Sequence, residues 1–238
     1  MFNAGFGILK SDSPLSVPGC QFFNISLESN TMTFNGGDIS EWRDKSKNQY
    51  HLVQGTGANQ ATYLTNAING LPVIEYDVDD VMDTAVSIPG ANLVDSSNWK
   101  NQTIYLVYTQ PISTANRTPF FWINGAVYTV AIIYHGTDIL YRMSSAAGVI
   151  SGSPSDRNGG YYIIELRRVN DSGTVNYYRD GLVMTDTDAM NSASLSGVSA
   201  TLEQTPYGNV GAMIIFNWST DAPSHATILR YLANNFGL

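Results

Sequence analysis

Short apolar and aromatic runs recur along most of the chain, and clusters of turn-forming residues separate them. Runs of this length are typical of β-strands rather than helices. Strands follow strands with few helical interruptions, which indicates antiparallel sheets packed face to face. The pattern predicts strands at 71–76, 103–108, 120–123, 126–134, 139–143, 161–168, 174–179, 182–184 and 210–218.

Two dipeptides predict tight hairpins between these strands, Asn124-Gly125 and Asp180-Gly181. Both central residues of such a turn must tolerate positive φ, which Asn, Asp and Gly do best.

The C-terminal segment has a helical period instead. Asp221 fits an N-cap, Pro223 fits the first turn, and Gly237 fits the left-handed residue beyond the last turn. The sequence therefore predicts one amphipathic helix over about 222–236. Its apolar face consists of Ile228, Tyr231, Leu232 and Phe236.

The length of 238 residues suits one domain, and neither an internal repeat nor a linker divides the chain. Residues 1–18 differ from the rest, because glycines and prolines alternate there with Phe2, Phe6, Ile8 and Leu9. We expect these residues to form an N-terminal arm, which either packs on a partner surface or is disordered. Residues 19–238 then form the domain itself.

Four motifs resemble the laminin-G-like, concanavalin-like jelly rolls. The first is the segment 39–48, which contains Trp42, Asp44 and Ser46 in a "W-x-D-x-S" order. The second is 69–77, similar to the family's "N-G-x-P-x-v-x-F-D-G" strand. The third is 177–181, similar to its "Y-x-D-G" hairpin. The last strand and closing helix, 212–217 and 231–238, make the fourth.

The resemblance covers roughly residues 20–238 and implies an all-β antiparallel jelly-roll sandwich with one C-terminal α-helix. Lys47 and Val78 stand where the family has glycines, and both substitutions concern turns. The family's architecture occurs in lectins, glycan-binding modules, some glycosidases and bacteriophage virion proteins, so the fold does not choose among these functions.

Charge excludes one class of partner. The net charge is −8, and Arg167-Arg168 is the only adjacent pair of basic residues. Nucleic-acid binding needs clustered Lys and Arg, so we expect none. Charged residues make up only 13% of the chain. A surface rich in Asn, Ser, Thr and Tyr suits hydrogen bonding to neutral partners or packing within an assembly.

Signals for export, membrane insertion and covalent chemistry are weak. The N-terminus lacks a signal-peptide pattern, and no apolar run reaches the ~20 residues of a membrane span. The single cysteine, Cys20, is expected to be a buried apolar residue, because His51, His135 and His225 are scattered. No phosphate-binding loop, nucleophile elbow or paired metal-ligand histidines occur, so no cofactor is expected.

The sharpest enzymatic candidate is the series Glu75, Asp77 and Asp79. On a strand these residues share one face, as in the E-x-D-x-E motif of concanavalin-like glycosidases. The third carboxylate is an aspartate, which shortens the acid/base arm by one methylene. We therefore expect Asp77 to belong to a structural turn and no catalytic residue to be present. Calcium binding by Asp77, Asp79, Asp80 and Asp83 stays open, although no EF-hand spacing is present.

Aromatic side chains are the remaining candidates, because they stack on sugars and line interfaces. Trp42 is expected in the core. The adjacent pairs Tyr161-Tyr162 and Tyr177-Tyr178 must point to opposite faces of their strands. No aromatic residue, including Trp99, Trp122 and Trp218, is assigned to a ligand by the sequence.

The leading hypothesis is a non-catalytic virion structural protein, such as a phage capsid decoration, fibre or tail component. It would be made in the host cytoplasm and would contact other subunits, in part through residues 1–18, as a homo-oligomer or part of a larger assembly. The alternative is a carbohydrate-binding module or receptor-binding lectin-like domain that contacts cell-surface glycans. The third is a glycoside hydrolase with a degenerate E-x-D-x-D motif.

Overall fold

A computed structural model describes most of the chain. The described residues are 13–77, 79–89, 102–109, 117–124, 127–135, 138–143, 146–150, 160–169, 174–179, 182–183, 199–205, 208–217 and 222–238.

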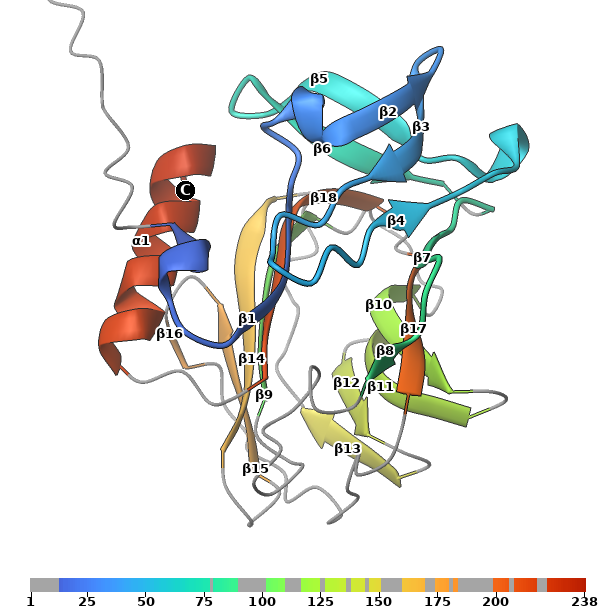
Figure 1. Ribbon diagram of the computed structural model, residues 1–238. Coiled ribbons are helices and arrows are strands. Elements are labelled where there is room, and N and C mark those ends of the chain that lie inside the picture. Colours follow the sequence, from blue (N-terminus) through green and yellow to red (C-terminus); the bar gives the residue numbers. More distant parts are fainter. Residues whose placement is uncertain are drawn as a thin grey trace, which may run out of the picture.

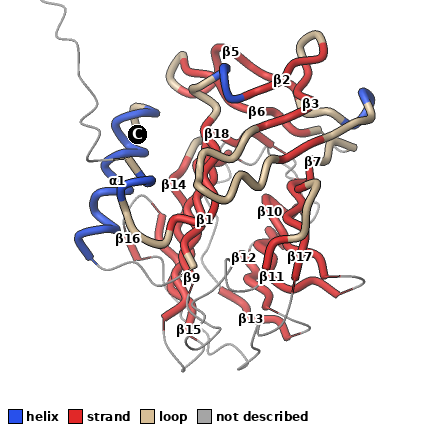
Figure 2. The backbone as a smooth tube through the Cα atoms, in the orientation of Figure 1, coloured by secondary structure: helices blue, strands red, loops and turns tan. Residues whose placement is uncertain are grey.

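The described elements are antiparallel strands, short 3-10 turns and one α-helix at the C-terminal end (Figures 1 and 2). The strands are β1 (Cys20–Ile25), β2 (Met32–Asn35), β3 (Asp38–Trp42), β4 (Leu52–Val53), β5 (Thr62–Ile68), β6 (Leu71–Tyr76), β7 (Met82–Thr84), β8 (Ile88–Pro89), β9 (Gln102–Thr109), β10 (Arg117–Asn124), β11 (Val127–His135), β12 (Asp138–Met143), β13 (Ala146–Ile150), β14 (Tyr162–Val169), β15 (Thr174–Arg179), β16 (Leu182–Val183), β17 (Ser199–Thr205) and β18 (Gly208–Phe216). The turns are η2 (Pro14–Ser16), η3 (Ser29–Thr31) and η4 (Gly57–Asn59), and the helix is α1 (Ala222–Phe236).

Two layers of strands form the sandwich. In the first, β18 pairs with β9, followed by β14, β15 and β16, and its other edge pairs with β1 and β6. In the second, β2, β3, β4, β7, β17, β10, β11, β12 and β13 pair in that order. The β5–β6 hairpin joins the layers, because β6 pairs with β18 while β5 reaches β3. The result is a curled all-β sandwich, as the sequence predicts (Figure 1).

Strand β9 contributes side chains to two hydrophobic cores, one on each of its faces. Ile104, Leu106 and Tyr108 face the space between the layers, whereas Tyr105 and Val107 face α1. Successive side chains of a strand point to opposite faces, and both faces of β9 are covered. All eight of its residues are therefore buried, which explains its continuous apolar run.

Helix α1 covers the outer face of the first layer and encloses the second core. Ile228, Leu232 and Phe236 are fully buried, and Tyr231 is 6% exposed, so the predicted apolar face is confirmed. Gly237 has φ +67, which confirms the expected left-handed residue after the helix. The predicted N-cap, Asp221, lies outside the described residues. Figure 1 shows α1 on the side of the first layer that carries β1 and β14, and Tyr231 of α1 packs edge-on against Phe23 of β1.

The β5–β6 hairpin holds the C-terminal end of α1. Its two turn residues, Asn69 and Gly70, both have positive φ, as a tight hairpin turn requires. Nδ2 of Asn69 donates to the carbonyl oxygens of Phe236, at 2.8 Å, and Gly237, at 3.0 Å. These carbonyls have no partner within the helix, so the hairpin satisfies them.

Each strand that the sequence predicts is present, with ends shifted by a few residues. The other described strands were not predicted: β1 to β5, β7, β8, β13 and β17. All six residues of β1 are buried, yet Gln21 and Asn24 interrupt its apolar pattern. Their amide nitrogens donate to backbone oxygens of Gly19 and Trp42, which offsets part of the cost of burial, whereas Oδ1 of Asn24 has no hydrogen-bond partner. Gly125, Asp180 and Gly181 of the predicted hairpin turns lie outside the described residues.

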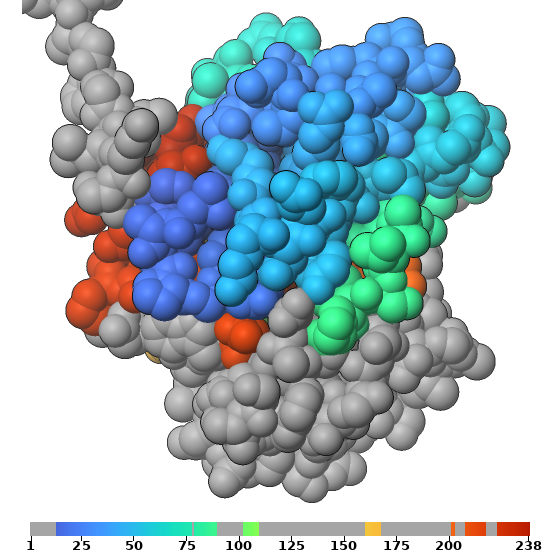
Figure 3. All heavy atoms as spheres, viewed as in Figure 1, coloured from blue at the N-terminus to red at the C-terminus, as the bar shows by residue number. Residues whose placement is uncertain are grey.

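Only the end of the predicted arm is described. Pro14 and Val17 are buried, and the η2 turn lies against α1 and β1. Leu15 stays 45% exposed. The division into an arm and a domain, and the contact of the arm with other subunits, stay predictions. Figure 3 shows that segments 13–60, in blue to cyan, cover much of the front of the molecule.

No helix in the described part of the chain is long and apolar enough to cross a membrane.

Candidate functional site

A line of polar side chains runs from β3 of the second layer, through the β5–β6 hairpin, to β18 and β9 of the first layer. The pairing register places Asp38 opposite Thr62, Thr62 opposite Glu75, and Glu75 opposite Asn209. Asn209 in turn lies opposite Thr109. Residues directly opposite each other in antiparallel strands project from the same face. The five residues therefore form one row, which we call the polar row.

Hydrogen bonds orient two parts of the polar row, Asp38 with Thr62 and Asn209 with Tyr161. Oγ1 of Thr62 donates to Oδ1 of Asp38 at 2.9 Å. Nδ2 of Asn209 donates to the Tyr161 hydroxyl oxygen at 2.9 Å. Glu75 is exposed, whereas Asp38, Thr62, Asn209 and Tyr161 are half-buried. Thr109 is only 6% exposed and its hydroxyl is buried. The row thus presents two carboxylates, the Thr62 hydroxyl and the Asn209 amide beside Tyr161.

The polar row lies on the same outer face as α1. In β6, Ile74 and Tyr76 face the core between the layers, so Val73 and Glu75 face outward. Val73 belongs to the core beneath α1, and Glu75 follows it two residues later. The polar row therefore lies next to the part of this face that α1 covers.

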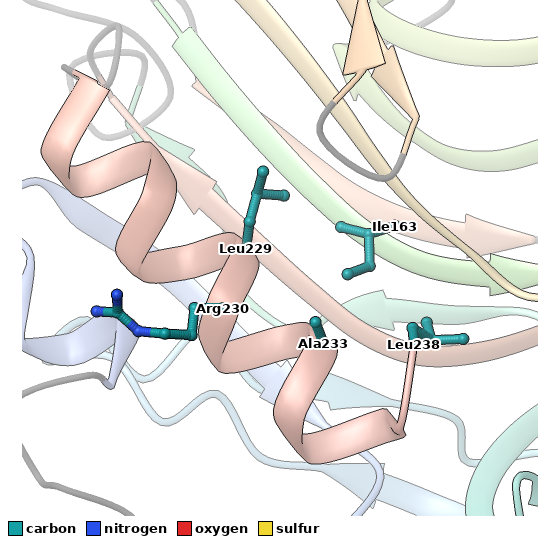
Figure 4. Close-up of a pocket in the computed structure, with 5 residues that line it drawn as sticks. All are labelled: Ile163, Leu229, Arg230, Ala233 and Leu238. Atoms are coloured by element: carbon teal, nitrogen blue, oxygen red, sulfur yellow. The ribbon is translucent and has the colours of Figure 1, made fainter.

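An apolar cleft borders this surface, between α1 and β14 (Figure 4). Its volume is ≈ 220 Å³, and it is lined by Ile163, Leu229, Arg230, Ala233 and Leu238. In Figure 4 the guanidinium of Arg230 points away from the other four side chains. Tyr161 and Ile163 are two residues apart along the chain, and both pack on the core beneath α1. Tyr161 consequently joins the cleft to the polar row.

A buried acid lies beneath the first turns of the helix. Glu165 is 0% exposed, and its Oε2 is 2.7 Å from Nδ1 of His225 in α1. At this distance the two groups form an ion pair when the imidazole is protonated, and neither carboxylate oxygen accepts a well-directed hydrogen bond. The Tyr105 hydroxyl lies 3.5 Å from the same nitrogen. The pair fastens the helix that forms one wall of the cleft.

Sequence reasoning missed the Glu165–His225 pair. The available signal was a glutamate within the otherwise apolar run 161–166. A charge on a strand covered on both faces needs a partner. The other histidines have different roles: Nδ1 of His51 accepts from the Asp44 backbone N–H at 3.1 Å, and His135 ends strand β11.

Glu75, Asp77 and Asp79 do not share a strand. β6 ends at Tyr76. The Asp77 backbone N–H donates to Oδ2 of Asp80 at 2.7 Å, and the Asp80 N–H donates to the Asp77 carbonyl. Asp77 thus belongs to a turn, as expected from the family motif. Val78 lies outside the described residues. The absence of enzymatic activity stays a prediction.

Acidic side chains gather near this turn without forming a chelating group. Burial raises the pKa of Asp80, and the charges of Asp77, Asp38 and Asp79 raise it further. Burial also raises the pKa of Asp83. Among the described residues, no three His, Cys, Asp or Glu side chains converge as metal ligands would.

Two predictions about aromatic residues are confirmed. Trp42 is fully buried, and Tyr161 and Tyr162 pack against different cores, so they point to opposite faces. Sequence reasoning did not single out Phe34, which is 41% exposed and packs edge-on against Tyr63. Trp99 and Trp218 lie outside the described residues, as do the side chains of Trp122, Tyr177 and Tyr178.

The first family motif has a structural role. Oδ1 of Asp44 accepts from the backbone N–H groups of Phe23 and Ser46, and Oδ2 accepts from the Tyr50 N–H and the Ser46 hydroxyl. Asp44 is 4% exposed, so these bonds offset the cost of burying its charge. The motif therefore ties β1 to the segment after β3.

Cys20 is 8% exposed, which confirms the expected buried position. Burial, together with the charge of Asp44, raises the pKa of its thiol to about 12.

No family model and no curated protein matches the sequence. Solved structures do resemble the fold. Trypanosoma rangeli sialidase in complex with sialic acid has a TM-score of 0.57 and 13% identity, over 93% of this chain and 34% of that chain. The binding domain of botulinum neurotoxin serotype D has a TM-score of 0.60 and 10% identity, over 90% of this chain and 52% of that chain. The binding domain of botulinum neurotoxin DC in complex with SialylT has a TM-score of 0.55 and 10% identity, over 90% of this chain and 51% of that chain.

The chain spans between about a third and about half of the length of these structures. Identities this low show a common fold and no more. The chain therefore shares an all-β sandwich architecture with a sialidase and with the binding domains of two botulinum neurotoxins.

Proposed function

We propose that this chain is a carbohydrate-binding domain whose sugar site is the polar row together with Tyr161. The hydrogen bond between Asn209 and Tyr161 carries the proposal, because it holds an aromatic ring beside a line of hydrogen-bonding groups. A sugar presents an apolar ring face and a rim of hydroxyl groups. An aromatic ring with adjacent amide, hydroxyl and carboxylate groups complements both.

The charge of the surface favours a neutral glycan. Asp38 and Glu75 place two carboxylates in the row, and the whole chain carries a net charge of −8. Carboxylates accept hydrogen bonds from sugar hydroxyls but repel an anionic sugar at short range.

Two of the similar structures support the carbohydrate class, because they contain sialic acid and SialylT. Those ligands belong to those proteins. The virion role and virion location expected from the sequence stay predictions, as do assembly with other subunits and the glycosidase alternative.

The experiment is a glycan array followed by calorimetry with the best ligand. Tyr161→Ala and Asn209→Ala should each weaken binding by about tenfold, which corresponds to ~1.4 kcal/mol. Tyr161→Phe should weaken binding less than Tyr161→Ala does, since it keeps the aromatic ring. Asn30→Ala is the matched control, because Asn30 is exposed in η3, outside the row. Wild-type affinity in both alanine variants, with unchanged melting temperatures, would rule out this site.

A further inference from the structure

The cleft beside Tyr161 is lined mainly by apolar side chains, and Arg230 is the one charged residue among its five lining residues. Ile163 is 3% exposed, and Leu238 is 40% exposed at the opposite wall. Leu229 and Ala233 supply the helix side, and Arg230 turns its guanidinium away (Figure 4). Hydroxyl groups buried there would lose their water without gaining partners, which costs free energy. A group that enters the cleft must therefore be apolar.

The walls of the cleft are held in place by backbone and side-chain contacts at both ends of α1. The Leu238 backbone N–H donates to the Ala233 carbonyl at 3.0 Å, which places Leu238 over the last turn of α1. Asn69 binds the carbonyls of Phe236 and Gly237. The Glu165–His225 ion pair fastens the other end of the helix. A preformed cleft loses little entropy when it is filled.

The cleft and the sugar site are neighbours on one face. Ile163 lines the cleft, and Tyr161 lies two residues before it in the chain, ~7 Å along a strand. Tyr161 bonds to Asn209 of the polar row. One ligand can therefore place a sugar on the row and an attached group in the cleft.

We propose that the ligand is a glycoside with an aliphatic aglycone, whose sugar lies on the polar row and whose alkyl chain fills the α1–β14 cleft. This inference rests on the proposed carbohydrate function. The volume of ≈ 220 Å³ leaves room for a short alkyl chain. The polar row sets the choice of sugar, and the cleft sets the preference for an alkyl substituent.

The test compares methyl and heptyl glycosides of the sugar selected on the array, with calorimetry on the full chain. The heptyl glycoside should bind at least about tenfold more tightly. Ala233→Leu narrows the cleft and should remove this advantage while leaving the methyl glycoside unaffected. Leu229→Ala widens the cleft and keeps it apolar, so the heptyl preference should persist. Leu15→Ala is the control for loss of an exposed leucine elsewhere.

The outcomes separate the two proposals. Equal affinity for both glycosides, with no differential effect of Ala233→Leu, overturns the aliphatic inference and leaves the sugar site standing. A heptyl preference that survives Ala233→Leu in a folded variant also overturns it. If no sugar binds, 1-heptanol is titrated alone: binding that Ala233→Leu abolishes supports the apolar cleft while the sugar site fails, and no binding overturns both.

Discussion

Oε2 of Glu165 lies 2.7 Å from Nδ1 of His225, which joins a fully buried carboxylate of β14 to the first turns of α1. Removal of one member of a buried ion pair leaves the other charge without compensation, whereas replacement of both by apolar groups is often tolerated. The pair thus makes the attachment of α1 sensitive to either residue.

His225→Ala should lower the free energy of unfolding by about 3 kcal/mol, because Glu165 would remain buried and unpaired. Urea denaturation followed by circular dichroism measures the change. The double variant Glu165→Leu, His225→Ala should recover part of the loss. If the single and double variants are equally destabilised, the pair is not the cause.

Substitutions of Asn69 test the contact between the β5–β6 hairpin and the C-terminal end of α1. Asn69→Ala removes two hydrogen bonds and puts alanine at φ 50, so it should cost about 2–4 kcal/mol. Asn69→Gly also loses the bonds but tolerates this backbone conformation, so its cost should be smaller, about 1–2 kcal/mol. Chemical denaturation of both variants gives the comparison. Equal costs would mean that the backbone conformation at 69 contributes nothing.

Gly211 lies where the surrounding packing leaves no room for a side chain. A Cβ atom there would lie 2.8 Å from Cε1 of Phe236 and 2.9 Å from Cγ1 of Val107. Gly211→Ala should therefore destabilise the fold by about 1–3 kcal/mol through overpacking. Gly55→Ala is the control, since no atom lies within 4 Å of its would-be Cβ. Thermal melts should separate the two, and similar melting temperatures would contradict the prediction.

Burial and the charge of Asp44 raise the pKa of the Cys20 thiol to about 12. The folded chain should therefore resist iodoacetamide at pH 8, whereas the chain in urea should react at the rate of an ordinary thiol. A thiol whose pKa is raised by folding stabilises the fold below its unfolded pKa, and this contribution falls as the pH rises toward 12. Stability should consequently decline above about pH 9, and Cys20→Ala should reduce that decline. Rapid alkylation of the folded protein would show that the site is open.

The local sequence pattern was sufficient to predict the strands that are continuous apolar runs or that turn residues delimit. Strand β6 and helix α1 have the predicted limits, because Asn69-Gly70 and Gly237 mark real changes of backbone conformation. Strand β1 was missed because Gln21 and Asn24 are buried with distant hydrogen-bond partners, the Asn48 amide and the Trp42 carbonyl. A polar residue in such a strand resembles an exposed residue until its partner is known.

The candidate site could not be predicted in the same way. The polar row collects one residue from each of β3, β5, β6, β18 and β9, between positions 38 and 209. A shift of one residue in any of these pairings would turn that side chain to the other face. The register depends on contacts between distant segments, so no local pattern contains it.

The sequence by itself determined the fold class, the closing helix and the buried positions of Trp42 and Cys20. Hydrophobic period and turn chemistry act over a few residues, and they are readable along the chain. Only the tertiary structure decided that Tyr161 meets Asn209, that Glu165 meets His225, and that α1 leaves an apolar cleft beside the polar row. These relations arise from strand register and from the packing of the helix on the sheet, which depend on the folded chain as a whole.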